Sequence, residues 1–409
     1  MKKAKKYFHI SIFILFLFCA CSENSDTTEP EGSMIKIGAL FSLSGGGPVQ
    51  GESVKASLET AVEDINQYFS DENSGNNVEL EISDIQNNVD TFIDRLQEMI
   101  DNNIKIIITS STSAHLEIIK SIADVSDVIL IDQGSTSPTL SVSDNIFRFV
   151  PDDVELAKVT ADVLTDDGIE YLFIFYRRDI WGIDLSGNTE IYFEQKGGSV
   201  LDKIYYEARV VGDDFDSKLQ ELDTAVGQAI SQYGAEKVAV SFICFEEGVD
   251  LFEKASSYAN LPSVKWYGSD GITQNTDLLL NESAAQFAID VGFLSPSFGI
   301  YDNAELNEVK AKVEQKTGQP AYVFGLVAYD ALWVAGLTLA ENQDADLSTL
   351  KSALKVKAAA YTGITGSIVL NEYENRTGTP YDFWGIAFEN GSYIWEKLIS
   401  SESVYMVTI

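Results

Sequence analysis

Hydroxyl side chains crowd two turns of the sequence that could together bind an anionic group. The first turn, 109–113, reads Thr-Ser-Ser-Thr-Ser and directly follows the apolar segment Ile104–Ile108. The second, 134–138, reads Gly-Ser-Thr-Ser-Pro and follows Val128–Ile131. A helix beginning at such a turn offers free backbone N–H groups and the positive end of its dipole to a carboxylate. The alternative is plain helix capping by one hydroxyl, with the others solvated.

An acidic residue follows a third apolar segment, in the second half of the chain. Asp270 stands in Gly-Ser-Asp-Gly at 268–271, after Val264–Tyr267. A carboxylate facing the hydroxyl turns would suit a ligand that is anionic at one end and cationic at the other. The other interpretation is an Asx turn, in which Asp270 accepts a hydrogen bond from the backbone beside Gly271.

Catalytic chemistry has few candidate residues here. The only histidines are His9 and His115, and no residue that could orient His115 as a base beside the first hydroxyl turn is evident. The nucleophile elbow, the P-loop, the dinucleotide fingerprint and the C-x-x-C motif are absent. So few histidines exclude a His-cluster metal site, and no EF-hand spacing occurs. We therefore expect neither an enzyme nor a bound metal or cofactor.

Composition excludes a nucleic-acid partner and indicates more than one domain. The 409 residues carry 28 basic and 63 acidic side chains, a net charge of −35, whereas phosphate backbones require clustered Lys and Arg. Apolar residues make up 45%, which is ample material for a core. At about 100–200 residues per domain, this length predicts two or three domains.

The N-terminus has the pattern of an export signal. Residues 1–6 hold four lysines, and the mostly apolar stretch that follows is too short to span a bilayer, which predicts a signal peptide over 1–20. The stretch ends Leu-Phe-Cys-Ala-Cys, which resembles the bacterial lipobox. That resemblance implies cleavage before Cys21 and a lipid on its sulfur. Ordinary signal-peptidase cleavage and an uncleaved anchor are the alternatives.

The residues after the signal are typical of a tether. Positions 21–33 are polar and acidic, which favours a flexible link between a lipid-anchored Cys21 and a folded body that begins near Met34. The body holds a single cysteine, Cys244, and so cannot form an internal disulfide. We expect an exported lipoprotein of a bacterial envelope, on the periplasmic or cell-surface side.

The body alternates short apolar segments with amphipathic ones, a rhythm that predicts parallel sheets covered by helices. The predicted strands are Ile35–Leu40, Val78–Ile82, Ile104–Ile108, Val128–Ile131, Tyr171–Tyr176, Val238–Phe245 and Val264–Tyr267. The predicted helices are Glu52–Phe69, Val89–Met99, Ala114–Ala123, Glu155–Leu164, Asp184–Lys196, Ser217–Tyr233, Val249–Tyr258 and Tyr322–Glu341. Two sheets imply two Rossmann-like lobes, with ligands at the carboxyl ends of the strands.

The body resembles the periplasmic Leu/Ile/Val-binding proteins, the type I solute-binding proteins of ABC importers, over nearly all of 34–395. The resemblance is carried by five pieces in order, namely Lys36–Leu40 with the turn up to Gly51, Ala61–Asn66, Arg148-Phe149, Tyr176–Gly182 and Tyr329–Leu332. It implies an α/β fold of two Rossmann-like lobes with parallel central sheets, joined by three crossover hinges. Lobe 1 would comprise 34–150 plus 296–380, and lobe 2 would comprise 151–295 plus 381–409.

The resemblance also implies an amino-acid site in the cleft between the lobes. The family's carboxylate-binding serine matches Ser113 best by spacing, with Ser111 as the alternative. Its backbone-carbonyl and threonine pair matches Gly134 and Thr136, with Ser135 between them. Its ammonium-binding glutamate matches Asp270, which is one methylene shorter.

Aromatic contacts carry over less completely. Trp181 matches the family's aromatic wall, and Gln50 takes an opening-loop position that is often aromatic. The second-lobe tyrosine has no clean counterpart, and Phe245 occupies that stretch.

These observations lead to one expected function and two alternatives. We expect a monomer that captures a small polar solute, a branched-chain amino acid, by cleft closure and hands it to an ABC permease in the membrane. One alternative is a binder of amides, urea or small aromatic acids. The other is a ligand-sensing module that acts through a signalling partner.

Overall fold

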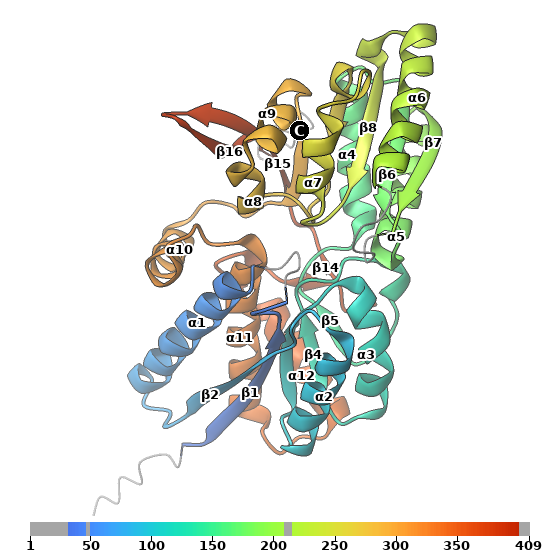
Figure 1. Ribbon diagram of the computed structural model, residues 1–409. Helices are drawn as coiled ribbons and strands as arrows, with labels where there is room; N and C mark the ends of the chain where they lie inside the picture. The colour runs from blue at the N-terminus through green and yellow to red at the C-terminus, as the bar shows by residue number, and fades with distance from the viewer. Residues whose placement is uncertain (1–31, 46–49, 208–214, 401–409) are drawn as a thin grey trace, which may run out of the picture.

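Two parallel sheets, one above the other in Figure 1, form the framework of the protein. The structure is a computed structural model and describes residues 32–45, 50–207 and 215–400. We call the part built on the five-stranded sheet lobe 1 and the part built on the four-stranded sheet lobe 2.

The sheet of lobe 1 has the strand order β2-β1-β3-β4-β5, and all of its neighbours are parallel. Its strands are β1 (Met34–Phe41), β2 (Asn77–Asp84), β3 (Ile106–Ser110), β4 (Ile129–Asp132) and β5 (Ile146–Arg148). The helices of this lobe are α1 (Gly51–Asp71), α2 (Val89–Asp101), α3 (Ser113–Val125), α10 (Ala304–Thr317), α11 (Val323–Asn342) and α12 (Leu347–Ala360).

Helices cover both faces of this sheet, which explains its continuous apolar strands. Ile106 and Ile108 pack on the side of α1 and α11, whereas Ile107 packs on the side of α2 and α3. Helix α11 is as long and apolar as a membrane-spanning segment, the only such helix in the described part of the chain. Most of it is buried, so its apolar character serves the core.

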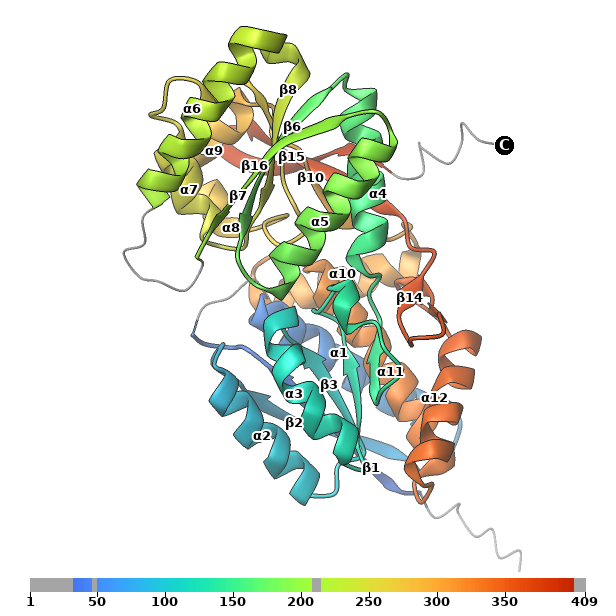
Figure 2. The ribbon, with the colours of Figure 1, turned by 90° about the vertical axis from the view of Figure 1, so that its right-hand side faces the viewer.

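The sheet of lobe 2 has the order β7-β6-β8-β9, again parallel throughout. Its strands are β6 (Tyr171–Arg177), β7 (Ser199–Tyr206), β8 (Val238–Ile243) and β9 (Lys265–Tyr267). Its helices are α4 (Asp153–Asp166), α5 (Ile180–Gln195), α6 (Phe215–Tyr233), α7 (Gly248–Ala255), α8 (Thr276–Leu280) and α9 (Glu282–Asp290). Figure 2 shows α4 and α5 side by side over this sheet.

An antiparallel sheet completes lobe 2. It joins β10 (Ser295–Phe298), β15 (Tyr381–Glu389) and β16 (Ser392–Ile399), and a bridge between Tyr267 and Leu294 links it to β9. Short elements fill the connections, namely the 3-10 turns η1 (Pro138–Leu140), η2 (Ala235–Lys237) and η3 (Leu261–Ser263), and the strands β11 (Thr362–Gly363), β12 (Gly366–Ser367), β13 (Val369–Leu370) and β14 (Arg376–Thr377).

The chain crosses between the lobes three times, from β5 to α4, from β10 to α10 and from β14 to β15. The predicted fold class, two lobes with parallel central sheets, is therefore confirmed. Strand β7 was not predicted, because its charged residues Asp202 and Lys203 interrupt the apolar pattern at the sheet edge. Helices α8, α9, α10 and α12 were not predicted either.

One boundary error bears on the site. We predicted a helix from Asp184, but α5 already begins at Ile180, because the Asp179 side chain caps it by accepting a hydrogen bond from Gly182 N at 2.9 Å. Trp181 therefore lies in the first helical turn instead of in a loop.

Candidate functional site

A cavity lies between the lobes at the carboxyl ends of both sheets. Its lining residues come from the turns after β3, β4, β8 and β9 and from the starts of α5 and α11, and they are Ser111, Thr112, Ser113, Gly134, Thr136, Trp181, Phe245, Asp270, Gly271, Tyr322 and Phe324. The space inside it that the centre of a water-sized sphere can reach is about 30 Å³, enough for about two water molecules, so the walls of the two lobes lie close together around the site.

Asp132, at the end of β4, holds the two hydroxyl turns together. One carboxylate oxygen accepts hydrogen bonds from Thr109 Oγ1 at 2.7 Å and Ser111 Oγ at 2.8 Å. The other accepts from the backbone N–H groups of Gly134 at 3.0 Å and Ser135 at 2.6 Å. Burial raises the pKa of Asp132, and these four hydrogen bonds oppose the shift. The turns are thus fixed by a shared acceptor beneath the cavity.

Hydrogen bonding distinguishes the two candidate serines. Ser111 donates its only hydroxyl proton to Asp132, so its oxygen can offer a ligand nothing but lone pairs. Ser113 Oγ instead accepts from Ser135 Oγ at 3.0 Å and from Ser137 N at 3.2 Å. The proton of Ser113 is not used in either bond, so it can be donated to an anionic ligand group. The geometry therefore favours Ser113 over Ser111 as a donor.

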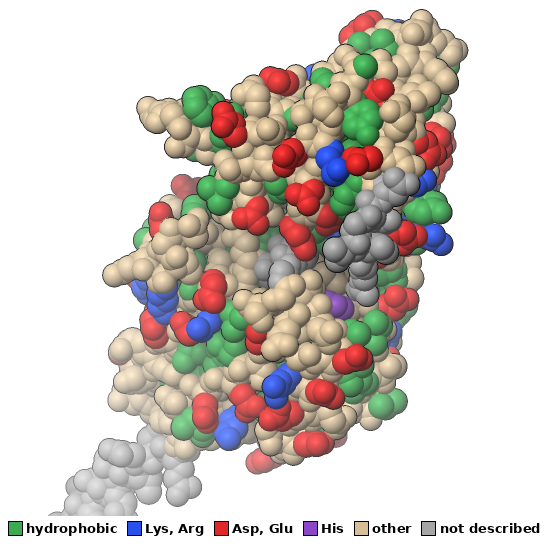
Figure 3. Space-filling model, viewed as in Figure 1, with side chains coloured by type: hydrophobic (Ala, Val, Ile, Leu, Met, Phe, Trp, Pro, Cys, Tyr) green, Lys and Arg blue, Asp and Glu red, His purple; other side chains and the backbone are tan. Residues whose placement is uncertain are grey.

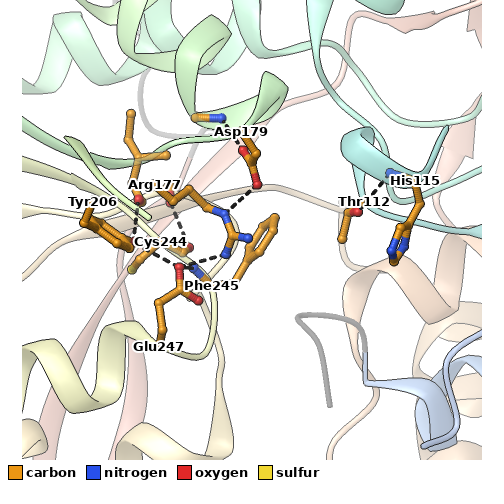
Figure 4. A network of polar contacts seen from close by, with 11 residues as sticks. Thr112, His115, Arg177, Asp179, Tyr206, Cys244, Phe245 and Glu247 are labelled. Atoms are coloured by element: carbon orange, nitrogen blue, oxygen red, sulfur yellow. Dashed lines mark hydrogen bonds and ion pairs between the residues drawn. The ribbon is translucent and has the colours of Figure 1, made fainter. Parts of the chain in front are cut away.

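Ser113 also occupies the first turn of α3. Thr112 caps this helix, since its side chain accepts from His115 N at 3.3 Å, and Figure 4 shows the two residues together. His115 is buried with its ring edge-on to Phe92 and does not line the cavity. The capping interpretation of this turn therefore holds for Thr112, whereas the role of Ser113 as a donor to a ligand stays a prediction.

Position 134 requires glycine, because the second hydroxyl turn passes close to the backbone of the first one there. A Cβ atom on Gly134 would lie 2.5 Å from the carbonyl oxygen of Ser111 and 2.9 Å from its nitrogen. The missing side chain lets the two turns approach closely enough to form one wall.

Asp270 faces this wall from lobe 2. Its side chain is buried, and its Oδ1 has no hydrogen-bond partner among the described residues. Burial raises the pKa of Asp270 to about 7, against the effect of the nearby backbone N–H groups of Asp270 and Gly271. These backbone N–H groups engage the carboxylate as an Asx turn would, and Oδ1 is the oxygen left at the cavity.

Aromatic residues form the remaining wall. The rings of Trp181 and Phe245 are stacked with centroids 4.3 Å apart, and the Arg177 guanidinium lies 4.0 Å from the centroid of the Phe245 ring. Arg177 is held by Asp179 and Glu247, each at 2.7 Å, as Figure 4 shows. Burial lowers the pKa of Arg177, but these two carboxylates outweigh it and raise the pKa. Phe245 is therefore clamped between a fixed cation and Trp181.

Two predicted site residues do not line the cavity. Ser135 lies beneath it and supports Ser113. Gln50 lies in neighbouring grooves, where its Nε2 donates to the carbonyl oxygen of Gln274 in lobe 2 at 3.1 Å. The sequence did not reveal Tyr322 and Phe324, because they reach the cavity only through the second crossing of the chain.

Direct contacts also join the lobes beside the cavity. Asp184 on α5 accepts hydrogen bonds from Thr139 N and Thr139 Oγ1, each at 3.0 Å, and a further one from Ser137 Oγ. These bonds tie the second hydroxyl turn to lobe 2. Over the described residues, no group of three or more His, Cys, Asp or Glu side chains is placed to hold a metal ion.

Comparison with known proteins identifies the family. A family model described as periplasmic binding protein matches residues 34–387, most of the chain. The chain belongs to the periplasmic binding protein family. The predicted resemblance to type I members of that family, including Leu/Ile/Val-binding proteins, is confirmed. Members of the family bind solutes outside the cytoplasm.

Three relatives illustrate the likeness of this periplasmic binding protein. An uncharacterised protein of Methanocaldococcus jannaschii is 26% identical, over 93% of this chain and 94% of its own length. An ABC transporter substrate-binding protein from Desulfitobacterium hafniense, solved in complex with Leu, has a TM-score of 0.70 at 19% identity, covering 89% of this chain and all of the other. A solute-binding protein from R. palustris, solved with benzoate, has a TM-score of 0.71 at 16% identity. The match covers 90% of this chain and 96% of the R. palustris chain.

Proposed function

We propose that this protein captures a branched-chain amino acid outside the cytoplasmic membrane and delivers it to an ABC permease. The observation that carries the proposal is the polarity of the cavity. The hydroxyl proton of Ser113 lies on the wall of lobe 1, and Oδ1 of Asp270, which has no hydrogen-bond partner among the described residues, lies on the wall of lobe 2. A ligand with a carboxylate at one end and an ammonium at the other matches both.

Binding would couple the two lobes. The proposed lobes, 34–150 with 296–380 and 151–295 with 381–409, differ from lobe 1 and lobe 2 at residues 296–298, which pair with β15 as part of β10. Each lobe supplies only half of the polar contacts. A ligand that bridges them stabilises the closed arrangement over the open one, because only the closed form makes both sets of contacts. The hydrogen bonds between Asp184 and Thr139 would then add to closure.

A small aromatic acid is the second candidate ligand. The stacked Trp181 and Phe245 rings favour a flat apolar group, and the R. palustris protein was solved with benzoate. Such a ligand has no cation for the buried Asp270, so its capture would leave that carboxylate unpaired. We therefore rank an amino acid first.

Mass spectrometry of the small molecule released when the purified protein is denatured tests this proposal. We expect leucine, isoleucine or valine in stoichiometric amount. Recovery of benzoate or of an amide at that level would contradict the amino-acid assignment and leave the solute-binding role in place.

Thr136→Val tests the carboxylate end of the site. This change keeps the shape of the side chain and removes its hydroxyl, so it should weaken leucine binding by about 1–3 kcal/mol. Calorimetry of the two proteins measures the difference. Thr224→Val, an exposed threonine on α6 whose hydroxyl bonds only to Gln220 of its own helix, is the matched control for a lost hydroxyl. An unchanged affinity in Thr136→Val would remove Thr136 from the site.

Cys21→Ser tests the proposed lipid anchor, which lies outside the described residues. Without the sulfur no lipid can be attached, so the protein should move from the membrane fraction to the soluble exported fraction. Cell fractionation followed by immunoblotting detects the change. A variant that stays membrane-bound and uncleaved would show that the N-terminal segment is itself an anchor. The proposed monomeric state is measured on the same soluble variant by light scattering.

A further inference from the structure

A buried ion-pair network lies behind the aromatic wall of the cavity, in lobe 2. Arg177 ends β6 and is 8% exposed. Its Nε donates to Asp179 and its Nη1 donates to Glu247, each at 2.7 Å. These three residues are not among those that line the cavity. Any effect of the network on a ligand must therefore act through the residues that it holds.

Glu247 fixes the turn that carries Phe245. The carboxylate oxygen that accepts from Arg177, Oε1, also accepts hydrogen bonds from Phe245 N at 3.2 Å and from Tyr206 Oη on β7 at 3.0 Å. The Arg177 guanidinium in turn lies 4.0 Å from the centroid of the Phe245 ring. Arg177 thus holds the side chain of Phe245 directly and its backbone through Glu247.

Asp179 fixes the helical turn that carries Trp181. One oxygen of Asp179 accepts from Arg177 Nε, and the other caps α5 by accepting from Gly182 N at 2.9 Å. A Cβ atom on Gly182 would lie 2.0 Å from the carbonyl oxygen of Arg177, so the first turn of α5 packs directly on the backbone of Arg177. Arg177 therefore holds both cavity-lining rings, each through a different carboxylate.

The Phe245 ring lies between the guanidinium and the indole. The Trp181 and Phe245 rings are stacked, with centroids 4.3 Å apart and planes inclined by 11°. Because the indole covers one face of the Phe245 ring, the guanidinium lies over the other face, where the ring attracts a cation. Figure 4 shows Arg177 between its two carboxylates, beside Phe245. We call Arg177, Phe245 and Trp181 the aromatic clamp.

The aromatic clamp touches the turn that carries Asp270. A Cβ atom on Gly271 would lie 2.5 Å from Phe245 Cδ1 and 2.7 Å from Trp181 Cη2. Both rings therefore abut the backbone next to Asp270, in a cavity whose walls are already close together. In so narrow a site, a small outward movement of the rings changes the size of the side chain that fits.

We propose that Arg177 is a positioning residue that sets the size of the ligand side chain. By holding Trp181 and Phe245 in place, it makes the site accept an amino acid with an aliphatic side chain and reject one with a larger aromatic side chain. The inference rests on the proposed amino-acid function and deepens it, because it names the residue that controls selection by size.

Arg177→Lys tests the proposal by the ratio of leucine affinity to phenylalanine affinity. Lysine keeps a charge for the two carboxylates, but it lacks the planar fork that binds both of them and stacks on Phe245. The Phe245 ring should then move outward, so leucine binds more weakly and phenylalanine is better accommodated. Calorimetry should show that the ratio falls at least about tenfold, the lower end of what a hydrophobic pocket gains from a difference of one methylene.

The ratio separates positioning from stability. A smaller fraction of folded protein removes sites for both ligands alike and leaves the ratio of their affinities unchanged. Glu247→Gln removes the charge at the other end of the network, so it should lower the ratio in the same direction, and it decides the question if Arg177→Lys does not fold. A ratio that stays at the wild-type value in the folded variants would overturn the proposal.

Arg178→Lys is the matched control. Arg178 pairs with Glu207 at 2.9 Å and lies 4.7 Å from the centroid of the Tyr205 ring, but it is exposed and away from the cavity. The substitution makes the same chemical change in a neighbouring residue, and it should alter the ratio less than about twofold because exposed ion pairs contribute little.

Phe245→Leu tests whether Arg177 acts through the aromatic ring. Residues that act through one contact are not additive, so adding Arg177→Lys to Phe245→Leu should change the ratio less than about twofold further. A further tenfold change in the double variant would contradict the clamp.

The ligand-free protein separates failure of this inference from failure of the proposed function. If neither amino acid binds the wild type, the proposed function fails, and near-ultraviolet circular dichroism still tests the clamp. The signal that Trp181→Phe removes should be smaller by at least about half in the Arg177→Lys background, because the stacked pair loses its fixed orientation. An unchanged signal would overturn the clamp. If leucine binds and the ratio does not change, the proposed function stands and this inference fails.

Discussion

Replacing Asp270 by Asn should weaken leucine binding by about 30-fold or more at pH 8, where the carboxylate is ionised. The asparagine keeps the size of the side chain, but it offers the ligand ammonium a dipole in place of a charge. Removing one partner of a desolvated ion pair costs about 2–5 kcal/mol, chiefly because the other charge remains buried and unpaired. Calorimetry of the two proteins with leucine measures the loss.

Asp277→Asn provides the matched control for Asp270→Asn. Asp277 lies on α8, a few residues further along the same lobe, and its side chain is exposed. Its substitution removes the same formal charge and should change leucine affinity less than about twofold, because exposed charges are screened. If Asp270→Asn bound leucine as tightly as this control, Asp270 would not be the ammonium partner.

Replacing Asp132 by Ala should abolish detectable leucine binding and lower the free energy of unfolding by about 3 kcal/mol or more. The change deprives four donors of their acceptor, and the backbone N–H groups of Gly134 and Ser135 have no freedom to turn elsewhere. The two hydroxyl turns would then lose their common support beneath the cavity. Urea unfolding and calorimetry measure the two effects.

Asp127→Ala separates this effect from simple loss of an acid. Asp127 pairs with Lys105 on the surface near the start of β4, so its removal should cost no more than about 1 kcal/mol. A stability loss in Asp132→Ala as small as that of Asp127→Ala would show that the turns are held by other contacts.

The aromatic clamp illustrates what sequence reasoning could and could not find. Trp181 and Phe245 were predicted as site residues, and both line the cavity, although Trp181 does so from a helix that begins earlier than expected. The contact of Arg177 with Phe245 could not be predicted. Arg177 ends a buried strand, and its two carboxylate partners lie 2 and 70 residues away in the chain.

The strands that carry the hydroxyl turns were predictable for a physical reason. Strands β3 and β4 are buried on both faces, so they appear in the sequence as unbroken apolar runs. Strand β7 is at a sheet edge, where charged side chains can reach solvent. These charged residues interrupt the apolar pattern by which a strand is predicted. Burial on both faces is therefore what made the central strands visible.

Residues that reach the cavity by a crossing were not predicted. Asp153 and Tyr322 stand at helix starts far from the hydroxyl turns in sequence, and only the three crossings bring them to the cavity region. In the sequence, Asp153 looks like an ordinary acid at a helix N-terminus. Its burial against Thr136 depends on how the chain crosses between the lobes, which no local pattern encodes.

The acidic surface agrees with the composition. Figure 3 shows Asp and Glu side chains spread over both lobes of the viewed face, as the net charge of −35 requires. Acidic side chains are therefore common on the surface, and charge alone does not single out a binding residue. The buried carboxylates at the cavity differ from the surface acids because they lack both solvent and hydrogen-bond partners.

The most direct test of the account is calorimetry of the wild-type protein, freed of bound ligand by unfolding and refolding, against leucine, valine, acetamide and benzoate. The account predicts one site per chain that binds leucine or valine at least about a hundredfold more tightly than acetamide or benzoate, a difference of about 2.7 kcal/mol. A protein that ignores both amino acids and binds benzoate or acetamide would contradict it.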